Sequence, residues 1–197
     1  MSQEKNSRYF SEDELAEMNF RELGRDVKIS RSALLYEPKY MSIGDHSMID
    51  DFCILSGNIT LGRNVHIAHG CRVIAGIEGV EMADFSGLAF GVTIFAQSDD
   101  YSGNALTNPT VPMRFRKITR ARVTLGRHVI VGSNSVVLPG VELAEGSSIG
   151  ACSLVTKSTQ PWFIYFGVPA KRLKARSQDM LGLEAEYLGN RPASANE

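Results

Sequence analysis

The sequence predicts an all-β solenoid, a fold in which the chain winds into stacked coils of short strands. Aliphatic residues recur at every sixth position over long stretches, and small residues follow most of them. Aromatic residues make up only 8% of a chain that is 43% hydrophobic, which fits a narrow core. One six-residue unit cannot bury its apolar side alone, so such units are stable only when they stack.

Each unit is predicted to form a short strand and a tight corner, with its aliphatic anchor pointing inward. The fourth residue after the anchor should face the same interior, and it is small or β-branched. Cys53 and Cys71 both hold this fourth position. Because three units would make one coil, we expect them to stack in neighbouring coils as buried, structural thiols. The anchors are Ile43, Ile49, Leu55, Leu61, Ile67 and Val73, then Met82, Leu88 and Ile94, then Leu125, Val131, Val137, Leu143, Ile149 and Val155.

Two segments precede and interrupt the repeat. Residues 1–26 are expected to form an N-terminal helical segment, because Ser11 and Glu14 match the capping-box pattern of a helix start. The solenoid should then span residues 27–160, with an inserted loop at 99–123 where the repeat is lost.

The segment after the solenoid is predicted to cap its open end. A strand and a helix are expected within 161–188, the helix running from about Leu173 to Leu188. The last residues, 189–197, are expected to form a disordered tail.

Composition excludes several function classes. The chain has 21 basic and 22 acidic residues and a formal charge of −1, so nothing indicates a nucleic-acid partner or an anionic membrane surface. It has no apolar run long enough for a spanning helix and no signal peptide at its start. Three cysteines do not make a disulfide framework, so a cytoplasmic location is expected.

Four hexapeptides resemble the repeats of the hexapeptide-repeat acyltransferases. These are LGRNVH at 61–66, LGRHVI at 125–130, VGSNSV at 131–136 and IGACSL at 149–154. The resemblance covers about residues 27–174. It implies a left-handed parallel β-helix of triangular section, usually a homotrimer with active sites between subunits.

The inserted loop is a candidate site for an anionic substrate. After Asp100 it carries five basic residues and no acidic one. Charged loops are most often merely solvated, but long loops on rigid scaffolds commonly carry function. Its SDDYSG and NPTVP segments resemble those of acetyltransferases that act on nucleotide-linked amino sugars, such as dTDP-4-amino-4,6-dideoxyglucose. Arginine side chains of the loop could bind the diphosphate of such a sugar. The expected substrate-binding residues are Asp100, Tyr101, Asn108, Arg114 and Arg116.

Acyl transfer needs a base for the acceptor's proton, and three candidates stay open. His66 is expected to face outward on a flat side, and His69 lies at the adjacent corner. Asp99 stands where the galactoside and maltose acetyltransferases carry a catalytic histidine. His46 and His128 fall in corners and are interpreted as turn histidines.

The resemblance also implies acetyl-CoA as co-substrate, bound along the C-terminal coils between subunits, and no metal. Small residues would let the pantetheine lie close to the backbone, and cations could meet the phosphates, although solvated lysine is the ordinary alternative. No GxGxxG or P-loop motif is present. The matching positions are Ser133, Ala151, Thr156, Lys157, Lys171 and Arg172.

The leading hypothesis is an acetyl-CoA-dependent acetyltransferase that acts on the amino group of a nucleotide-linked amino-deoxysugar for surface-polysaccharide synthesis. O-acetylation of a saccharide hydroxyl is the alternative within this class. A γ-type zinc carbonic anhydrase would need a third histidine beside His66 and His69, and none stands at a suitable spacing. A non-catalytic scaffold is the remaining alternative.

Overall fold

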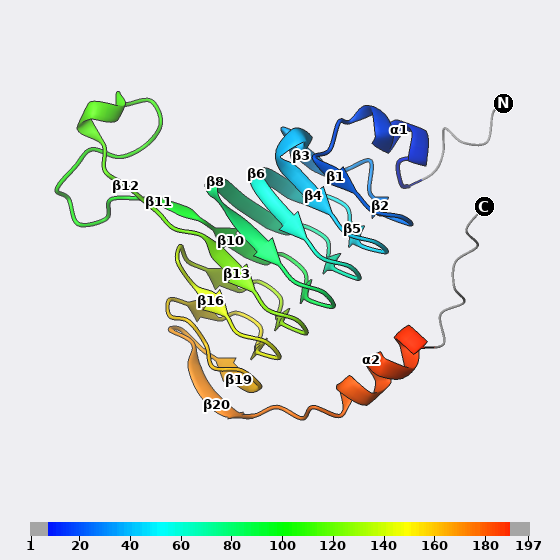
Figure 1. Ribbon diagram of the computed structural model, residues 1–197. Coiled ribbons are helices and arrows are strands. Elements are labelled where there is room, and N and C mark those ends of the chain that lie inside the picture. The colour runs from blue at the N-terminus through cyan, green and yellow to red at the C-terminus, as the bar shows by residue number, and fades with distance from the viewer. Residues whose placement is uncertain (1–7, 190–197) are drawn as a thin grey trace.

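The computed structural model describes residues 8–189, most of which wind into a parallel β-helix (Figure 1). Short strands from successive coils stack side by side and build three faces, called here the first, second and third face in chain order. β6 (Ile54–Leu61) and β8 (Arg72–Met82) are longer because each continues around the corner from the third face into the first. The predicted solenoid of six-residue repeats, with short helices near its ends and an extended loop, is confirmed.

Within each face, parallel hydrogen bonding joins one coil to the next. The first face contains β1 (Glu22–Leu23), β4 (Met41–Ile43), the ends of β6 and β8, β13 (Val123–Leu125) and β16 (Glu142–Leu143). The second contains β2 (Lys28–Ile29), β5 (Met48–Ile49), β7 (His66–Ile67), β9 (Gly87–Leu88), β14 (Ile130–Val131), β17 (Ser148–Ile149) and β19 (Phe163–Phe166). The third contains β3 (Leu34–Tyr36), the starts of β6 and β8, β10 (Thr93–Phe95), β15 (Val136–Val137) and β18 (Leu154–Val155).

The core follows the predicted pattern. Every anchor is buried, with at most 3% of its surface exposed. Cys53 and Cys71 are fully buried, and their thiols donate to the carbonyl oxygens of Ala68 and Ala89 at 3.1 and 3.0 Å. Contact with Cys53 and burial raise the pKa of the Cys71 thiol. These cysteines therefore pack the interior, as expected from their spacing.

Small residues follow many anchors because neighbouring coils approach closely there. A Cβ atom on Gly44 would lie 2.5 Å from the carbonyl carbon of Gly62, in the next coil. A Cβ atom on Gly126 would lie 2.6 Å from the backbone nitrogen of Glu145. The atoms in the way belong to the backbone and cannot rotate aside. A coil spacing of about 4.8 Å thus excludes larger side chains at these glycines.

The N-terminal segment agrees with the predicted helix and adds a strand. α1 (Glu12–Glu17) begins with a complete capping box, in which Ser11 Oγ accepts from the Glu14 backbone and Glu14 Oε2 accepts from the Ser11 backbone. The solenoid starts earlier than the expected residue 27, because Leu23 in β1 pairs with Ile43 in register.

The inserted loop leaves the solenoid after β10. β11 (Gln97–Asp99) and β12 (Ile118–Arg120) pair antiparallel and project away from the coils (Figure 1). Two 3-10 helices complete the described elements, η2 (Pro38–Tyr40) and η3 (Met113–Phe115), the second of which lies in this loop.

The C-terminal segment differs from the expectation. Residues Lys171–Ala175 form β20, which pairs antiparallel with the exposed edge of β19, so the predicted helix start at Leu173 is wrong. α2 (Met180–Gly189) begins later and runs back beside the corners between the first and second faces (Figure 1). It therefore covers a side of the solenoid and not its end. Apart from Gly189, the expected disordered tail lies outside the described residues.

Replacing Gly126 with Val is expected to lower the free energy of unfolding by about 1–3 kcal/mol, because the new side chain overpacks against a backbone. Thermal or urea unfolding of the purified protein measures it. Gly182→Val is the matched control, since a Cβ at Gly182 would have no heavy atom within 4 Å. Equal unfolding midpoints for the two variants would contradict the explanation.

Among residues 8–189, no helix has the length and apolar character needed to cross a membrane.

Candidate active site

Asp99 closes the base of the inserted loop. Its Oδ1 lies 3.0 Å from Nη2 of Arg116, and its Oδ2 accepts the backbone N–H of Asn108 at 3.0 Å. The Arg116 guanidinium and the Asn108 N–H hold the pKa of Asp99 below its ordinary value. The carboxylate is therefore ionised at neutral pH, and 29% of its side chain is exposed.

The other predicted substrate residues have different environments. Arg116 is only 11% exposed and is engaged by Asp99, so its guanidinium is not open to solvent. Asp100 accepts hydrogen bonds from Ser102 and Asn104 within its own turn, and these bonds lower its pKa. Tyr101, in contrast, is 94% exposed.

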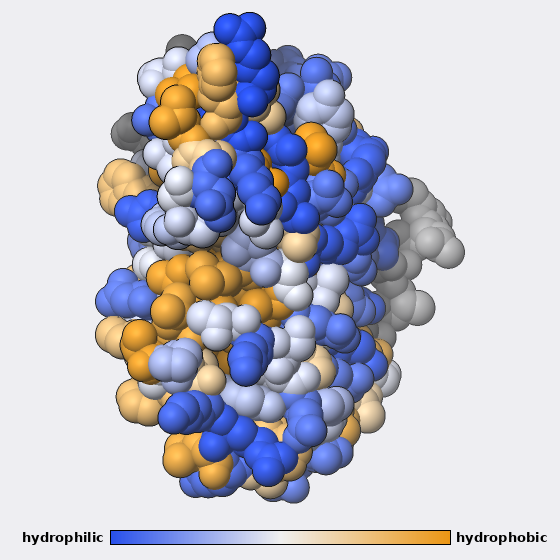
Figure 2. Space-filling model, turned by 90° about the vertical axis from the view of Figure 1, so that its left-hand side faces the viewer, coloured by the Kyte–Doolittle hydropathy of each residue, from blue (hydrophilic) through white to orange (hydrophobic). Residues whose placement is uncertain are grey.

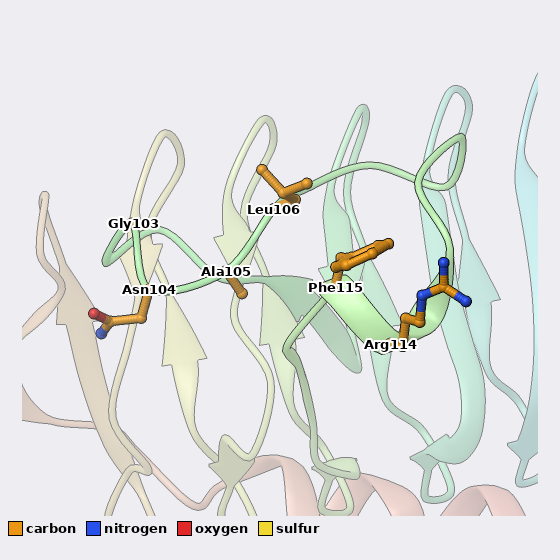
Figure 3. A pocket seen from close by; sticks show the side chains of 6 residues that line it. All are labelled: Gly103, Asn104, Ala105, Leu106, Arg114 and Phe115. Carbon is orange, nitrogen blue, oxygen red and sulfur yellow. The ribbon is translucent and has the colours of Figure 1, made fainter.

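A cavity of about 400 Å³ lies within the loop (Figure 3). Arg114 stacks on the ring of Phe115 at 4.7 Å, and Leu106 also lines the cavity. The polar side chains of Arg114 and Asn104 lie at its two ends (Figure 3). Asn108, near the loop base, caps its own turn by accepting from Thr110. The lining residues are Gly103, Asn104, Ala105, Leu106, Arg114 and Phe115.

His66 and His69 belong to a compact group that also contains Arg8, Asp50 and Asp51, called here the histidine cluster. Asp50 is its centre, with a side chain only 7% exposed. Asp50 Oδ2 lies 2.9 Å from His66 Nε2 and 3.3 Å from His69 Nδ1. His66 is 53% exposed, whereas the His69 ring stacks on Phe90 at 5.4 Å.

Sequence reasoning missed Asp50, Asp51 and Arg8. Asp50 directly follows the anchor Ile49, a position that is usually small, and this departure was the available signal. Arg8 lies outside the repeat, so no periodicity points to it.

The histidine cluster and the loop lie on different parts of one chain. The cluster occupies β7 and the corners between the second and third faces, whereas the loop leaves at a corner between the third and first faces. Among the described residues, no hydrogen bond or ion pair joins Asp99 to either histidine.

The two remaining histidines occupy turns, as predicted. His46 and His128 both have a φ of +59°. His46 pairs with Asp26 at 3.1 Å, and His128 pairs with Glu184 of α2 at 2.9 Å. His128 therefore helps to hold α2 against the coils.

The expected cofactor residues gather at the C-terminal coils. Ser133 and Ala151 lie in stacked corners, where Ser133 O accepts from the backbone of Cys152. The backbone of Ala170 donates to Leu154 O at 2.8 Å, which places the GVPAKR segment beside β18. Thr156, Lys157 and Lys171 are exposed, and Arg172 stacks on Phe163 and donates to Gln160. Within the described part of the chain, no group of three or more His, Cys, Asp or Glu residues could hold a metal ion.

Known proteins share both the repeat and nearly the whole length of the chain. The family described as bacterial transferase hexapeptide (six repeats) matches residues 40–75 and 122–157. dTDP-4-amino-4,6-dideoxy-D-glucose acyltransferase of Escherichia coli is 38% identical over 182 residues, which cover 91% of this chain and 94% of that protein. Galactoside O-acetyltransferase of Escherichia coli is 25% identical over 152 residues, 75% of this chain and 70% of that protein.

Solved structures show the same likeness in three dimensions. A variant of AntD, an N-acyltransferase from Bacillus cereus, in complex with dTDP and coenzyme A is 40% identical, with a TM-score of 0.93 over 94% of this chain and 100% of that one. AntD in complex with dTDP and 3-hydroxybutyryl-CoA is 40% identical, with a TM-score of 0.91 over 93% of this chain and 97% of that one.

Proposed function

The chain belongs to the hexapeptide-repeat acyltransferases, and from this premise we propose that it transfers an acyl group from acyl-coenzyme A to the amino group of a dTDP-linked amino-deoxysugar. The observation that carries the proposal is the 40% identity, at a TM-score of 0.93, to an N-acyltransferase solved with dTDP and coenzyme A. The acetyl group is the acyl group that we expect. Because AntD was solved with 3-hydroxybutyryl-CoA, the assay must also include this longer acyl group.

Asp99 and His66 have different roles at the substrate amine, the first in binding and the second in proton removal. Asp99 stays ionised because its pKa is lowered, so it suits the binding of a substrate ammonium group. A carboxylate with so low a pKa is a weak base, whereas an imidazole is better matched to proton removal near neutral pH. His66 therefore accepts a proton from the ammonium group, and the freed amine attacks the thioester carbonyl. The C–S bond then breaks, and coenzyme A leaves as the thiol with the proton that the new amide nitrogen loses. His69 is held by Arg8 and is the weaker candidate.

The anionic parts of the two substrates meet basic side chains. Arg114 lines the loop cavity, where it can pair with the diphosphate of the nucleotide sugar. Thr156, Lys157 and Lys171 are exposed beside the C-terminal coils and can receive the phosphates of coenzyme A. The small side chains of Ser133 and Ala151 leave room for the pantetheine. Arg172 is the remaining expected contact to the phosphates of coenzyme A.

Assembly of three chains would bring the loop of one subunit to the histidine cluster of another. The loop exposes large apolar side chains although it stands away from its own coils: Tyr101 is 94%, Leu106 58% and Met113 55% exposed. Figure 2 shows a further apolar patch on the side from which the loop projects, surrounded by polar side chains, as at many protein contacts. A homotrimer with shared active sites accounts for both. Light scattering should then give three times the 21.6 kDa of one chain.

The product is expected to serve surface-polysaccharide synthesis in the cytoplasm, where nucleotide sugars and acyl-coenzyme A are both available. Fractionation of cells that make the protein tests the location.

One assay tests the reaction. The purified protein is incubated with acetyl-CoA or 3-hydroxybutyryl-CoA and with dTDP-4-amino-4,6-dideoxyglucose, while thiol release and product mass are followed. The control acceptor is the same nucleotide sugar with a hydroxyl in place of the amine. Thiol release that depends on the amine is expected. Transfer only to the hydroxyl would make the protein an O-acyltransferase, and transfer to neither would contradict the proposal.

A further inference from the structure

Arg8 reaches from outside the solenoid into the histidine cluster. Its Nη2 lies 3.0 Å from Asp50 Oδ1 and 2.7 Å from His69 Nε2, and its Nε lies 3.1 Å from Asp51 Oδ2. Asp51 in turn accepts the hydroxyl of Ser30. One guanidinium thus joins two carboxylates and an imidazole.

The contact with Arg8 fixes the proton of His69. An arginine side chain keeps its charge and has only hydrogen-bond donors. At 2.7 Å its Nη2 must donate to His69 Nε2, so this ring nitrogen carries a lone pair and no proton. The remaining ring proton of His69 then sits on Nδ1, which is buried and lies 3.3 Å from Asp50 Oδ2, although the geometry there is not that of a hydrogen bond.

His66 has the opposite arrangement. Its Nε2 lies 2.9 Å from Asp50 Oδ2, and an ionised carboxylate only accepts hydrogen bonds, so His66 carries its proton on Nε2. Its Nδ1 then holds the lone pair. Within residues 8–189 this nitrogen makes no hydrogen bond or ion pair, and the side chain is 53% exposed. The open lone pair is the one that a substrate proton could reach.

We propose that Arg8 is a positioning residue that gives the two histidines different tautomers, so that His69 is a blocked acceptor and His66 an open base. The proposal rests on the proposed function, in which His66 accepts the proton. In the described part of the chain, the charged and titratable groups in contact with His69 are Arg8, Asp50 and Asp51, and His66 shares Asp50 with it. Without Arg8, His69 Nε2 could carry a proton and donate it to Asp51 Oδ2, which lies 3.4 Å away.

The tautomers can be measured without any substrate. Nitrogen NMR of ¹⁵N-histidine-labelled protein should show His69 protonated on Nδ1 and His66 on Nε2. In Arg8→Met, Nε2 of His69 should become protonated. In Arg8→Lys it should stay unprotonated, because an ammonium group also donates a hydrogen bond. Glu14→Gln is the matched control, because it removes the charge that Glu14, in the same N-terminal segment as Arg8, pairs with Arg31, and it leaves the cluster intact. Identical histidine spectra in wild type and Arg8→Met would overturn the proposal.

Kinetics give a second readout that a merely structural role would not move. Arg8→Met should lower kcat about ten- to a hundredfold and leave KM for acyl-coenzyme A nearly unchanged, as a misplaced catalytic group does. Arg8→Lys should recover most of the loss. A lower unfolding temperature, with a loss of kcat that Arg8→Lys does not recover, would instead indicate loss of fold and would contradict the positioning role. A wild-type protein with no acyl transfer would contradict the proposed function, while the NMR result would still decide the role of Arg8.

Discussion

Replacing His66 with Gln should lower kcat for acyl transfer by about two to four orders of magnitude, as loss of a general base does. Glutamine can still donate to Asp50, so the local packing is retained while the basic lone pair is lost. KM for both substrates should change little, because the side chain acts on the proton and not on binding. Steady-state thiol release measures both parameters.

His46→Gln is the matched control for His66→Gln. His46 pairs with Asp26 in a corner of the solenoid, outside the histidine cluster, and should retain wild-type turnover. Wild-type turnover of His66→Gln would remove His66 from the mechanism.

The solenoid could be predicted because its causes are local. The anchors from Ile43 to Val73 keep one phase, and each recurs for the same reason, a narrow core that stacks coil upon coil. The change of phase before Met82 also has a visible cause. Gly76 and Gly79 adopt φ values of +56° and +98°, which lets β8 bulge and then resume its inward register.

The path of the C-terminal segment could not be predicted in the same way. The apolar spacing around Leu173 resembles a helix, but β19 offers an unpaired edge that Lys171–Ala175 can satisfy. This edge exists only once the last coil has formed. Tertiary pairing therefore outweighs the local pattern.

The sequence suggests candidate site residues by their type, but it does not show the contacts that they make. His66, His69 and Asp99 stand out because such side chains carry acyl-transfer chemistry. That Arg8 pairs with His69, or Arg116 with Asp99, depends on contacts between segments far apart in sequence. In the proposed mechanism, these contacts decide which group is a base and which is a fixed charge.

Replacing Asp99 with Asn should lower kcat/KM for the amino sugar by about one to three orders of magnitude, as loss of one partner of a hydrogen-bonded charge pair does. Asparagine can still accept from Arg116 through its oxygen, but it has no charge with which to bind an ammonium group. Asp45→Asn, in a corner of the solenoid outside the inserted loop, is the control, since Asp45 accepts from the backbone of Arg25 and pairs with its side chain at 3.6 Å. An unfolding temperature equal to that of wild type shows that the loop base is retained.

The pH dependence of the reaction tests the role of Asp99. Because Arg116 and Asn108 lower the pKa of Asp99, its charge is present above the ordinary carboxyl range and is lost only as pH falls through the lowered value. The ratio of kcat/KM between wild type and Asp99→Asn should therefore stay constant at and above neutral pH and should fall toward one only at acid pH, below the ordinary carboxyl range. A ratio that changes near neutral pH would contradict the binding role of the Asp99 carboxylate.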